Sequence, residues 1–485
     1  MSGLLDEVVA VGSTRRRALV VLMIAMLAGG GLYLFFRSHP SSSLVPEVAR
    51  ASSLPQPPPP WSPAQIKELL SVVASTEAEG LRPADYNLDA LGREVAQRQF
   101  GPKLDALAEK TLAAIAHDFA AGRVRNRHSF NWYIDYQGPD LAQLTAQAMA
   151  ARERGDLRSW VASLLPTDPA YHALRDALAN TQDEDRRDRI KANLERWRWL
   201  PRDFGGGDQL YINLPTYRVD LIRAGERVAS YKAVIGATDM PTPVLSAPVR
   251  QVIANPDWIV PASIVRKSKL RPGTSSRYSF STRPDGTLRV RQKPGPGNAL
   301  GKLKIEFPNK LAIYFHDTPS RSLFGASDRT FSHGCVRVQD IEELAGQVVS
   351  NPERLSKALA GANTRSLPAR PNLRANVVYL TLVPDGAGGI SDVGDPYMLD
   401  EKLVAALAGR KPKPATLGPK AEGTTTPKPR EVQPAASREP PGESASPLAV
   451  PEASPTAPSP ESEDLSPPLE NEGANDAGET LPRPE

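Results

Sequence analysis

The sequence predicts a multidomain α+β protein with a membrane helix near its N-terminus, an all-α domain, a mainly β domain and a disordered C-terminal tail. Three patterns predict this organisation. Residues 18–36 carry no charge, apolar residues then recur at helical spacing as far as about residue 200, and from about residue 210 they alternate as in strands. A chain of 485 residues is long enough for two or three domains.

The charge and the cysteine content exclude several classes of protein. The chain has 59 Lys and Arg against 55 Asp and Glu, a net charge of +4, and a single cysteine, so a disulfide framework is excluded. Residues 411–485 carry a net charge of −6, which leaves +10 on residues 1–410. No basic cluster is interleaved with aromatic residues, and we therefore expect no nucleic acid partner.

The N-terminal segment predicts export. The nineteen uncharged residues 18–36 suffice for one membrane helix, since an α-helix rises ~1.5 Å per residue and the hydrocarbon core is ~30 Å thick. Three arginines precede the run and one follows it, so by the positive-inside rule residues 1–17 are cytoplasmic and the chain after Arg37 lies outside. A cleaved signal peptide is the alternative, with Ala28 and two glycines as a poor cleavage site, but the apolar run continues to Phe36.

A linker and a helical domain are expected next. Residues 37–60 are rich in serine and proline, which favours an extended, semi-rigid linker. Over residues 61–207 we expect a helical domain, in which Ser62 and Pro63 are typical of a helix start and Gly122 closes a later helix. The apolar residues at helical spacing are Ile66, Leu69, Leu70 and Val73 in the first of these helices and Leu112, Ile115, Ala116 and Phe119 in the second.

A mainly β domain is expected over residues 208–405 and a tail over residues 406–485. After Arg410 there are 17 prolines and no aromatic residue in 75 residues. Such a segment cannot bury enough apolar area to offset an ordering entropy of ~1–2 kcal/mol per residue, so we expect disorder. The strand-like runs of the β domain include the alternating Leu210, Ile212 and Leu214, the alternating Tyr217, Val219 and Leu221, and the segments 233–235, 249–253, 311–315 and 377–382.

The single cysteine lies in the most informative segment of the chain. Cys335 follows Ser332, His333 and Gly334, and the strand-like run before His316 ends nineteen residues upstream. A thiol with a pKa near ~8.5 is mostly protonated at neutral pH, so a nucleophilic cysteine needs an imidazole to accept its proton. Contact with His333 along one strand would be strained, whereas His316 can approach from a neighbouring strand. We therefore expect Cys335 to be the nucleophile and His316 the base.

Further features beside Cys335 suit the same chemistry. The backbone amides of Gly334 and Cys335 are candidates for the oxyanion hole, because a glycine lets the chain bend without a side chain in the way of the substrate. Arg337 is a candidate partner for a substrate carboxylate. Asp340 and Glu343 resemble a capping box that opens a helix after the site.

The same residues also have simpler explanations. A single cysteine is often a small buried apolar residue, and His316 could be a hydrogen-bonded histidine at a strand end. Arg337 could be a surface residue of a strand. His316, His333 and Cys335 could instead bind a metal ion, but no Cys-x-x-Cys or His-x-x-x-His pair supports that alternative, and we predict no metal site.

At these residues the sequence resembles the L,D-transpeptidase catalytic domain of the YkuD type, in the YcbB-like branch that also carries a helical scaffold domain. The family signature is a histidine followed, after a loop, by Ser-His-Gly-Cys with an arginine two residues beyond. The resemblance covers about residues 61–405. The matching stretches are HDTP at 316–319, LF at 323–324, SHGCVRV at 332–338, PGP at 294–296, NALG at 298–301, NPDW at 255–258, VP at 260–261 and ERWRWLP at 195–201, with GLRPADY at 80–86 and GRV at 122–124 in the scaffold.

The resemblance implies an acyl transfer on peptidoglycan that needs no cofactor. Cys335 would attack the carbonyl of the third residue of a tetrapeptide stem, commonly diaminopimelate, and expel the terminal D-alanine to leave a thioester. His316 would accept and return the proton, with its ring oriented by the backbone carbonyl of Asp317. The side-chain amine of a neighbouring stem would then resolve the thioester and form a 3→3 cross-link. The residues expected to bind the substrate are Tyr314, Ser332, His333 and Arg337.

Several functions remain open at this point. With water as acceptor the same site would be an L,D-carboxypeptidase or an amidase, and with a protein lysine it would anchor proteins to peptidoglycan. A non-catalytic cell-wall scaffold protein is the alternative from a different class, but it would be expected to lack the cysteine or the histidine. We expect a single-pass inner-membrane protein with its catalytic domain in the periplasm, and the tail is a candidate binding segment for envelope proteins.

Overall fold

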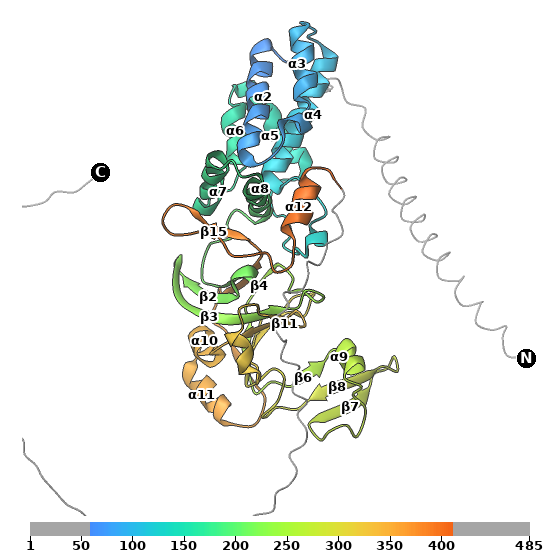
Figure 1. Cartoon of the computed structure of the whole chain (residues 1–485), viewed down its shortest axis with the longest axis vertical. Coiled ribbons are helices and arrows are strands. Elements are labelled where there is room, and N and C mark those ends of the chain that lie inside the picture. The colour runs from blue at the N-terminus through green and yellow to red at the C-terminus, as the bar shows by residue number, and fades with distance from the viewer. Residues whose placement is uncertain (1–58, 411–485) are drawn as a thin grey trace, which may run out of the picture. The chain divides into compact units, whose positions relative to one another are not determined.

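The structure is a computed structural model that describes residues 59–410 (Figure 1). The predicted cytoplasmic segment 1–17, the membrane helix 18–36, most of the linker and the tail beyond Arg410 lie outside the described residues. Between residues 59 and 410 no helix is both long and apolar enough to cross a membrane. The predicted order of a helical region followed by a mainly β region is confirmed.

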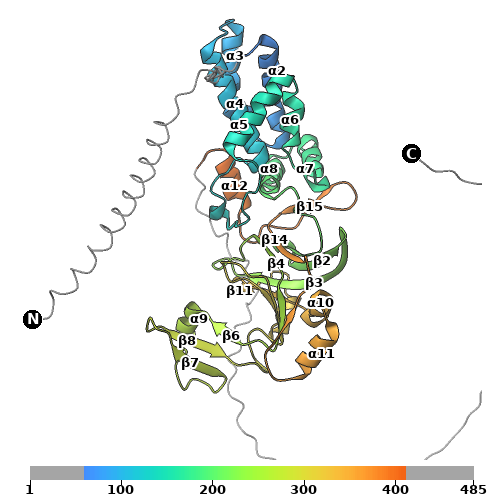
Figure 2. The same cartoon turned by 180° about the vertical axis from the view of Figure 1, so that it is seen from behind.

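The first part of the described chain is helical (Figure 2). Three 3-10 turns interrupt it: η1 (Thr76–Glu79), η2 (Pro83–Tyr86) and η3 (Arg127–Phe130). The α-helices of this part are α2 (Pro63–Ser75), α3 (Leu88–Ala96), α4 (Pro102–Ala121), α5 (Leu141–Arg154), α6 (Leu157–Ser163), α7 (Pro169–Asn180) and α8 (Glu184–Trp199).

The start of α2 shows why a helix forms there. The Ser62 hydroxyl accepts a hydrogen bond from the Gln65 amide at 3.3 Å, and the Gln65 side chain accepts one from the Ser62 amide at 2.9 Å. Pro63 occupies the first helical position, where its missing N–H has no cost. The predicted helical spacing is confirmed, and the buried side chains of α2 are Ile66, Leu69, Val72 and Val73.

Eleven strands of the second part form one mixed sheet: β1 (Gln209–Asn213), β2 (Arg218–Arg223), β3 (Glu226–Gly236), β4 (Leu245–Pro248), β5 (Gln251–Ala254), β9 (Leu303–Glu306), β10 (Phe315–His316), β11 (Thr330–Ser332), β12 (Val336–Val338), β13 (Arg365–Pro368) and β14 (Arg374–Val378). Their order is β13-β5-β9-β10-β12-β3-β2-β1-β14-β4, and β11 pairs with β3 outside that path. The pairs β10–β12, β1–β14 and β3–β11 are parallel.

The run at 311–315 is a strand only at its end, which corrects the sequence prediction. Ala312 has a φ of +55°, and the Asn309 side chain accepts hydrogen bonds from the amides of Leu311 and Ile313 at 3.0 and 3.2 Å. Asparagine side chains stabilise turns in this way, because they replace backbone acceptors. The chain therefore enters β10 from a tight turn.

Two helices follow the strands of the site. α10 (Ile341–Val348) packs on β9, and α11 (Pro352–Ala360) packs on β5 and β13. The predicted helix after Asp340 is confirmed, but its capping box is wrong. Asp340 has a φ of +51° and makes no capping hydrogen bond, and Glu343 instead accepts one from the Tyr231 hydroxyl at 3.1 Å.

A smaller sheet lies between β5 and β9 in the sequence. It consists of β6 (Trp258–Val260), β7 (Tyr278–Thr282) and β8 (Leu288–Gln292) with the helix α9 (Ala262–Lys267), and its apolar cluster of Val260, Val265 and Val290 is separate from the main core. The remaining elements are the hairpin β15 (Leu382–Pro384) and β16 (Ile390–Asp392) and the 3-10 turns η4 (Leu214–Thr216) and η5 (Arg321–Gly325).

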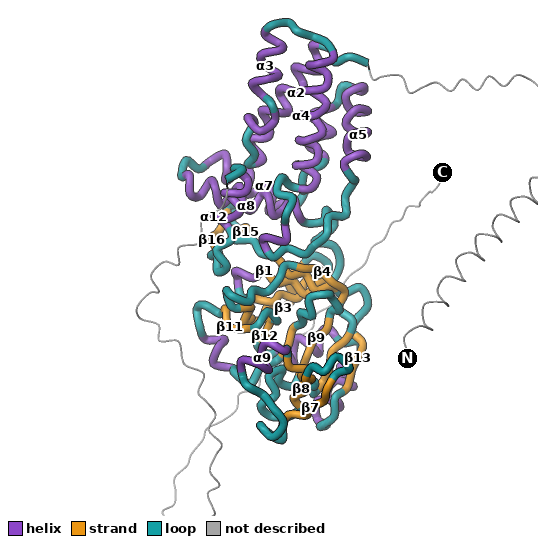
Figure 3. Tube along the Cα trace, turned by 90° about the vertical axis from the view of Figure 1, so that its right-hand side faces the viewer, coloured by secondary structure: helices purple, strands orange, loops and turns teal. Residues whose placement is uncertain are grey.

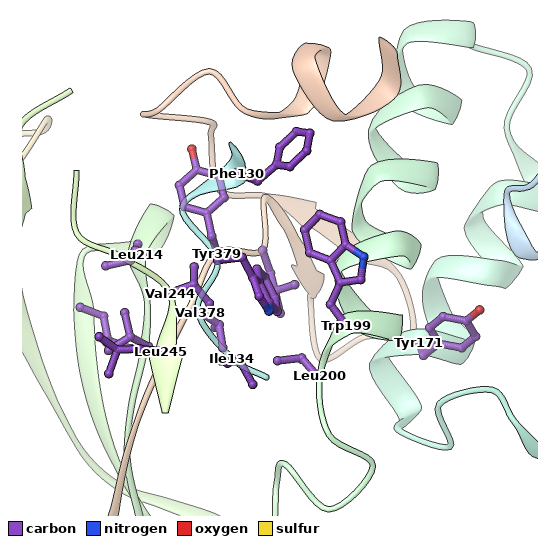
Figure 4. Packing of buried hydrophobic residues seen from close by; sticks show 14 of the residues in the cluster. Phe130, Ile134, Tyr171, Trp199, Leu200, Leu214, Val244, Leu245, Val378 and Tyr379 are labelled. Atoms are coloured by element: carbon purple, nitrogen blue, oxygen red, sulfur yellow. The ribbon is translucent and has the colours of Figure 1, made fainter. Parts of the chain in front are cut away.

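One apolar core runs through the helical region and the large sheet (Figure 4). Trp199 at the end of α8 meets Trp132 edge to face, with ring centroids 5.0 Å apart. Trp132 forms a bridge with Val244, whose amide donates to the Asn131 carbonyl at 2.9 Å and whose carbonyl accepts from the Tyr133 amide at 2.8 Å. The two regions therefore share backbone hydrogen bonds as well as apolar contacts.

The chain returns to the helical region after the sheet. The helix α12 (Asp400–Leu407) packs on α8 (Figure 3). Buried Asp400 accepts hydrogen bonds from Arg196 at 2.5 Å and from the Thr381 hydroxyl at 2.7 Å, and Asn193 donates to the same hydroxyl at 2.8 Å. Because α12 extends to Leu407, the predicted start of the tail at residue 406 is slightly too early.

A buried ion pair lies inside the helical region. Arg198 and Glu195 are one turn apart on α8, their side chains are fully buried, and their nearest charged atoms are 2.8 Å apart. Arg198 also donates to the Glu79 carbonyl at 2.8 Å and to the Tyr171 hydroxyl at 3.1 Å, while Glu195 accepts from the Val124 amide at 2.7 Å. These hydrogen bonds offset part of the cost of removing both charges from water.

Replacing Arg198 by methionine is expected to lower the free energy of unfolding by about 3–5 kcal/mol, because Glu195 is left buried without its cation. The matched control, Arg154→Met, removes an exposed pair with Asp156 and should change it by less than about 1 kcal/mol. Urea unfolding followed by circular dichroism measures both variants. Similar effects in the two would contradict the prediction.

Candidate active site

Two neighbouring parallel strands carry the predicted catalytic pair. β10 pairs with β12 so that Phe315 lies opposite Val336 and His316 lies opposite Arg337. Cys335 directly precedes β12. The histidine on β10 and the cysteine at the start of the adjacent strand β12, nineteen positions apart in the sequence, therefore lie close to each other across the strand pair, as the sequence predicts.

The register places the candidate residues on one face of the sheet. Side chains alternate along a strand, and residues directly opposite on neighbouring strands point to the same side. Phe315 and Val336 are completely buried in the core. His316 is a diagonal neighbour of Cys335 across the strand pair, a separation that side chains of this size can span. By this alternation, the residues that share the face opposite to Phe315 and Val336 are Tyr314, His316, Cys335 and Arg337.

The His316 ring is buried and held in one orientation. Its Nδ1 lies 2.5 Å from the backbone carbonyl of Asp317. Because a carbonyl only accepts hydrogen bonds, Nδ1 carries the proton and Nε2 is left as the basic nitrogen. Burial, aided by the positive charge of Arg337, lowers the pKa of His316 to about 3. The imidazole is therefore neutral at physiological pH.

The Cys335 thiol is half-buried and protonated in the resting protein. Burial raises the pKa of Cys335 above its usual value, and hydrogen bonding to Tyr314 lowers it by less. The thiol donates a long hydrogen bond to the Ala312 carbonyl, with Sγ and the oxygen 3.8 Å apart. A neutral thiol thus lies beside a neutral imidazole, rather than a thiolate beside an imidazolium.

The loop before Cys335 is braced by Ser332. The buried Ser332 hydroxyl donates to the Cys335 carbonyl at 2.5 Å and accepts from the Gly334 amide at 3.2 Å. Gly334 has a φ of +106°, which favours glycine. The Gly334 amide therefore has an acceptor within the loop, and Ser332 braces that loop, while the oxyanion role of Gly334 and the substrate contact of Ser332 stay predictions. The Cys335 amide makes no hydrogen bond within residues 59–410.

Arg337 and His333 differ in their surroundings. Arg337 is half-buried and forms no ion pair with any carboxylate in the part of the chain that the structure describes. Burial lowers its pKa, yet it stays charged at neutral pH, so it is available for an anionic group. His333 is exposed, whereas His316 is buried. Burial and then the charges of Lys267 and Arg337 lower the pKa of His333.

Tyr314 packs against the catalytic pair. Its ring meets the His316 ring edge to face, with centroids 5.7 Å apart, and the Lys304 ammonium lies 4.2 Å from the centre of the Tyr314 ring. Burial, followed by the nearby Cys335, raises the pKa of Tyr314. Tyr314 is therefore a neutral phenol beside the thiol.

Sequence patterns did not predict the residues that hold Asp317. Its buried carboxylate accepts a hydrogen bond from the Lys302 amide at 2.8 Å and forms an ion pair with Arg321 at 2.6 Å. Gly301 has a φ of +59°, and a Cβ at this position would collide with the Asp317 carboxylate. These contacts fix the carbonyl that orients His316, and the only sequence signal was the NALG stretch that ends at Gly301.

The metal alternative needed His316, His333 and Cys335 to converge. Among the residues that have described positions, no group of three or more His, Cys, Asp or Glu side chains is arranged to hold a metal ion.

Two family models match the chain. Residues 207–366 match the L,D-transpeptidase catalytic domain (YkuD), and residues 56–178 match the scaffold domain. His316 and Cys335 lie inside the first match. The domain pair expected from the sequence is therefore confirmed.

A relative and several solved structures are similar to this chain. A Haemophilus influenzae protein named "Putative L,D-transpeptidase" is 26% identical over 376 residues, which cover 70% of this chain and 75% of that protein. The Ldtfm–avibactam carbamoyl enzyme aligns at 12% identity and a TM-score of 0.19 over 36% of this chain and 48% of that chain. Mycobacterium tuberculosis L,D-transpeptidase 1 aligns at 14% identity and a TM-score of 0.16 over 35% and 60%. The chain thus spans about half of those solved chains.

Proposed function

We propose that this chain, an L,D-transpeptidase by its catalytic domain, forms 3→3 cross-links between peptidoglycan stem peptides. One observation carries the proposal. His316 lies on β10 and Cys335 directly precedes the adjacent parallel strand β12, in a register that gives both side chains the same face, where an imidazole with a free Nε2 can take the proton of the thiol.

The first half-reaction forms a thioester. The Cys335 Sγ attacks the carbonyl of the third stem residue while the thiol proton passes to His316 Nε2. The bond from that carbonyl to the D-alanine nitrogen then breaks, and His316 returns the proton to the leaving amine. The Cys335 amide, which makes no hydrogen bond within the described chain, stabilises the oxyanion of the tetrahedral intermediate.

The second half-reaction passes the acyl group to an amine. The side-chain amine of a diaminopimelate from a neighbouring stem attacks the thioester and loses a proton to His316, and the Cys335 thiolate that leaves recovers it. Arg337 pairs with a carboxylate of the substrate, because it is a cation without an ion-pair partner among residues 59–410 and lies on the same face as the thiol.

We also propose that residues 18–36 anchor the chain in the inner membrane with the catalytic domain in the periplasm. The support is the uncharged run with three arginines before it and one after it. Protease added to spheroplasts should digest the catalytic domain, and protection in intact spheroplasts would contradict this orientation.

Mass spectrometry of products tests the cross-linking proposal. Disaccharide tetrapeptides incubated with the purified protein should give dimers joined through two third residues, with one D-alanine released per dimer. Tripeptides alone would indicate a carboxypeptidase, and stem peptides linked to an added lysine-bearing peptide would indicate an anchoring enzyme. An unchanged mixture would contradict all three.

The protonation states predict an unusual pH profile for acylation. Since the folded pKa of His316 is lowered to about 3, the base stays deprotonated as the pH falls through the ordinary imidazole range near ~6.5. The rate of acylation by a carbapenem is therefore expected to stay nearly constant between about pH 5 and pH 8. Adduct mass against time at each pH measures it, and a tenfold fall per unit below pH 6.5 would show that the imidazole titrates normally.

A further inference from the structure

Two cavities meet where the helical region joins the large sheet, away from the catalytic pair. One has a volume of about 280 Å³ and the other about 410 Å³, and Leu200, Pro201 and Arg202 line both. The first is bounded by the 166–168 turn, the end of α8 and the strands β1 and β2, and the second by the 136–139 segment and the end of α6. Together they form a groove, which we call the junction groove.

The junction groove presents aromatic rings. Trp197, Phe204 and Tyr211 line the first cavity and Tyr136 lines the second, and each of these four side chains is only partly buried. Aromatic residues make up only 6% of the whole chain. The indole N–H of Trp197 is buried without a hydrogen-bond acceptor among the described residues.

The charges of the junction groove exclude an anionic ligand. Arg202 is the only Lys or Arg among the lining residues, and its guanidinium is occupied by the carbonyls of Phe119, Ala120 and Leu164 at 3.0, 2.8 and 2.7 Å. The carboxylates at the rim are Asp168 and Asp203. A neutral ligand rich in hydroxyl and amide donors matches this combination of flat apolar rings and acceptor oxygens.

The junction groove lies on the same face of the sheet as the catalytic pair. Paired residues on neighbouring strands share a face, and so do residues two apart on one strand. Following the register from β12 through β3 and β2 to β1 therefore links Arg337 to Tyr211. The paired residues along this path are Arg337 and Val234, Lys232 and Arg218, then Asp220 and Tyr211.

The separation sets which part of the substrate can lie in each place. Three strand spacings lie between β12 and β1, or roughly 14 Å at ~4.8 Å each. The register also offsets Tyr211 from Cys335 by about six residues along the strands, or roughly 20 Å at ~3.3 Å each, so about 24 Å separates them. Three extended residues of a stem peptide span only roughly 10 Å, so a sugar in the junction groove does not carry the stem that reacts at Cys335. A more distant sugar of the same glycan strand carries it.

We infer that the junction groove binds N-acetylated sugars of the glycan strand that carries the stem peptide. This inference rests on the proposed function. A proline-rich peptide is the other ligand that aromatic grooves accept, but it offers few N–H donors to the Asp203 carboxylate and to the second oxygen of Asp168, whose first oxygen accepts from the Ala170 amide at 2.8 Å. The sugar rings stack on Phe204 and Tyr211, and their hydroxyl groups donate to the rim.

Calorimetry with chitotetraose, a neutral tetramer of N-acetylglucosamine without peptide, tests the inference on the full chain. We expect saturable binding at one site, and about tenfold weaker binding in Phe204→Ala and in Tyr211→Ala. The control Tyr133→Ala removes an exposed aromatic side chain outside the junction groove and should leave Kd unchanged. Thermal melting checks the fold of each variant, and Tyr136→Ala replaces any variant that does not fold.

Three results would overturn the inference. They are the absence of saturation up to about 10 mM chitotetraose, equal Kd values in all folded variants, and binding of decaproline that is lost in the groove variants while chitotetraose binding is not.

Kinetics separate this inference from the proposed function. Groove variants should raise KM for glycan-linked stems at constant kcat and leave turnover of a free tetrapeptide unchanged. If no substrate is cross-linked but chitotetraose binding is lost in the variants, only the proposed function fails.

Discussion

Replacing Cys335 by alanine is expected to abolish cross-linking, with a loss of about 10⁴-fold or more, because the sulfur that forms the acyl-enzyme is removed. Cys335 is the only cysteine in the chain, so no second thiol can replace it. Its backbone amide remains, and a carbonyl can still be polarised there, but without a covalent intermediate this gives little turnover. Mass spectrometry of muropeptides measures the loss.

A second readout separates loss of the nucleophile from loss of the fold. The wild-type protein should gain the mass of one carbapenem, whereas Cys335→Ala should gain none. Cys335 is only half-buried, so removing its sulfur should cost little stability, and the two proteins should melt at similar temperatures. An adduct on the alanine variant would place the nucleophile elsewhere.

Local sequence patterns predicted the elements whose conformation is decided by residues close together in the sequence. The cap at Ser62 and the helical spacing after it gave α2, and the change of spacing near Leu210 gave the start of the sheet. In both cases the side chains that decide the conformation are within a few residues of each other. The position of His316 next to Cys335 followed from one further assumption, that two strand-like segments around a loop become neighbours.

Sequence patterns could not reveal features that depend on particular side-chain hydrogen bonds. Asn309 ends the run before Phe315 by capping a turn, which apolar periodicity cannot reveal. The Gly334 amide is occupied because Ser332 folds back on it, which depends on a backbone φ that the sequence only permits. The packing of α12 on α8 depends on the pairing of Asp400 with Arg196, which are 204 residues apart.

Replacing His316 by alanine is expected to slow acylation by about 10²–10⁴-fold at pH 7, because the thiol loses its proton acceptor. The matched control is His333→Ala, which removes an exposed imidazole two residues from Cys335 and should change the rate by less than about threefold. Rates of carbapenem adduct formation in the three proteins measure this ranking. The opposite ranking would transfer the base to His333.

The pH dependence of a conservative variant distinguishes a base from a structural residue. His316→Gln keeps a polar side chain of similar size but cannot accept the proton, so attack must await spontaneous ionisation of the thiol. Because burial raises the pKa of Cys335, the variant rate should rise about tenfold per pH unit through the neutral range, whereas the wild-type rate stays nearly constant. The difference between the two should therefore shrink toward high pH. A residue that only supported the loop would lower the rate by the same factor at every pH, and that result would remove His316 from the chemistry.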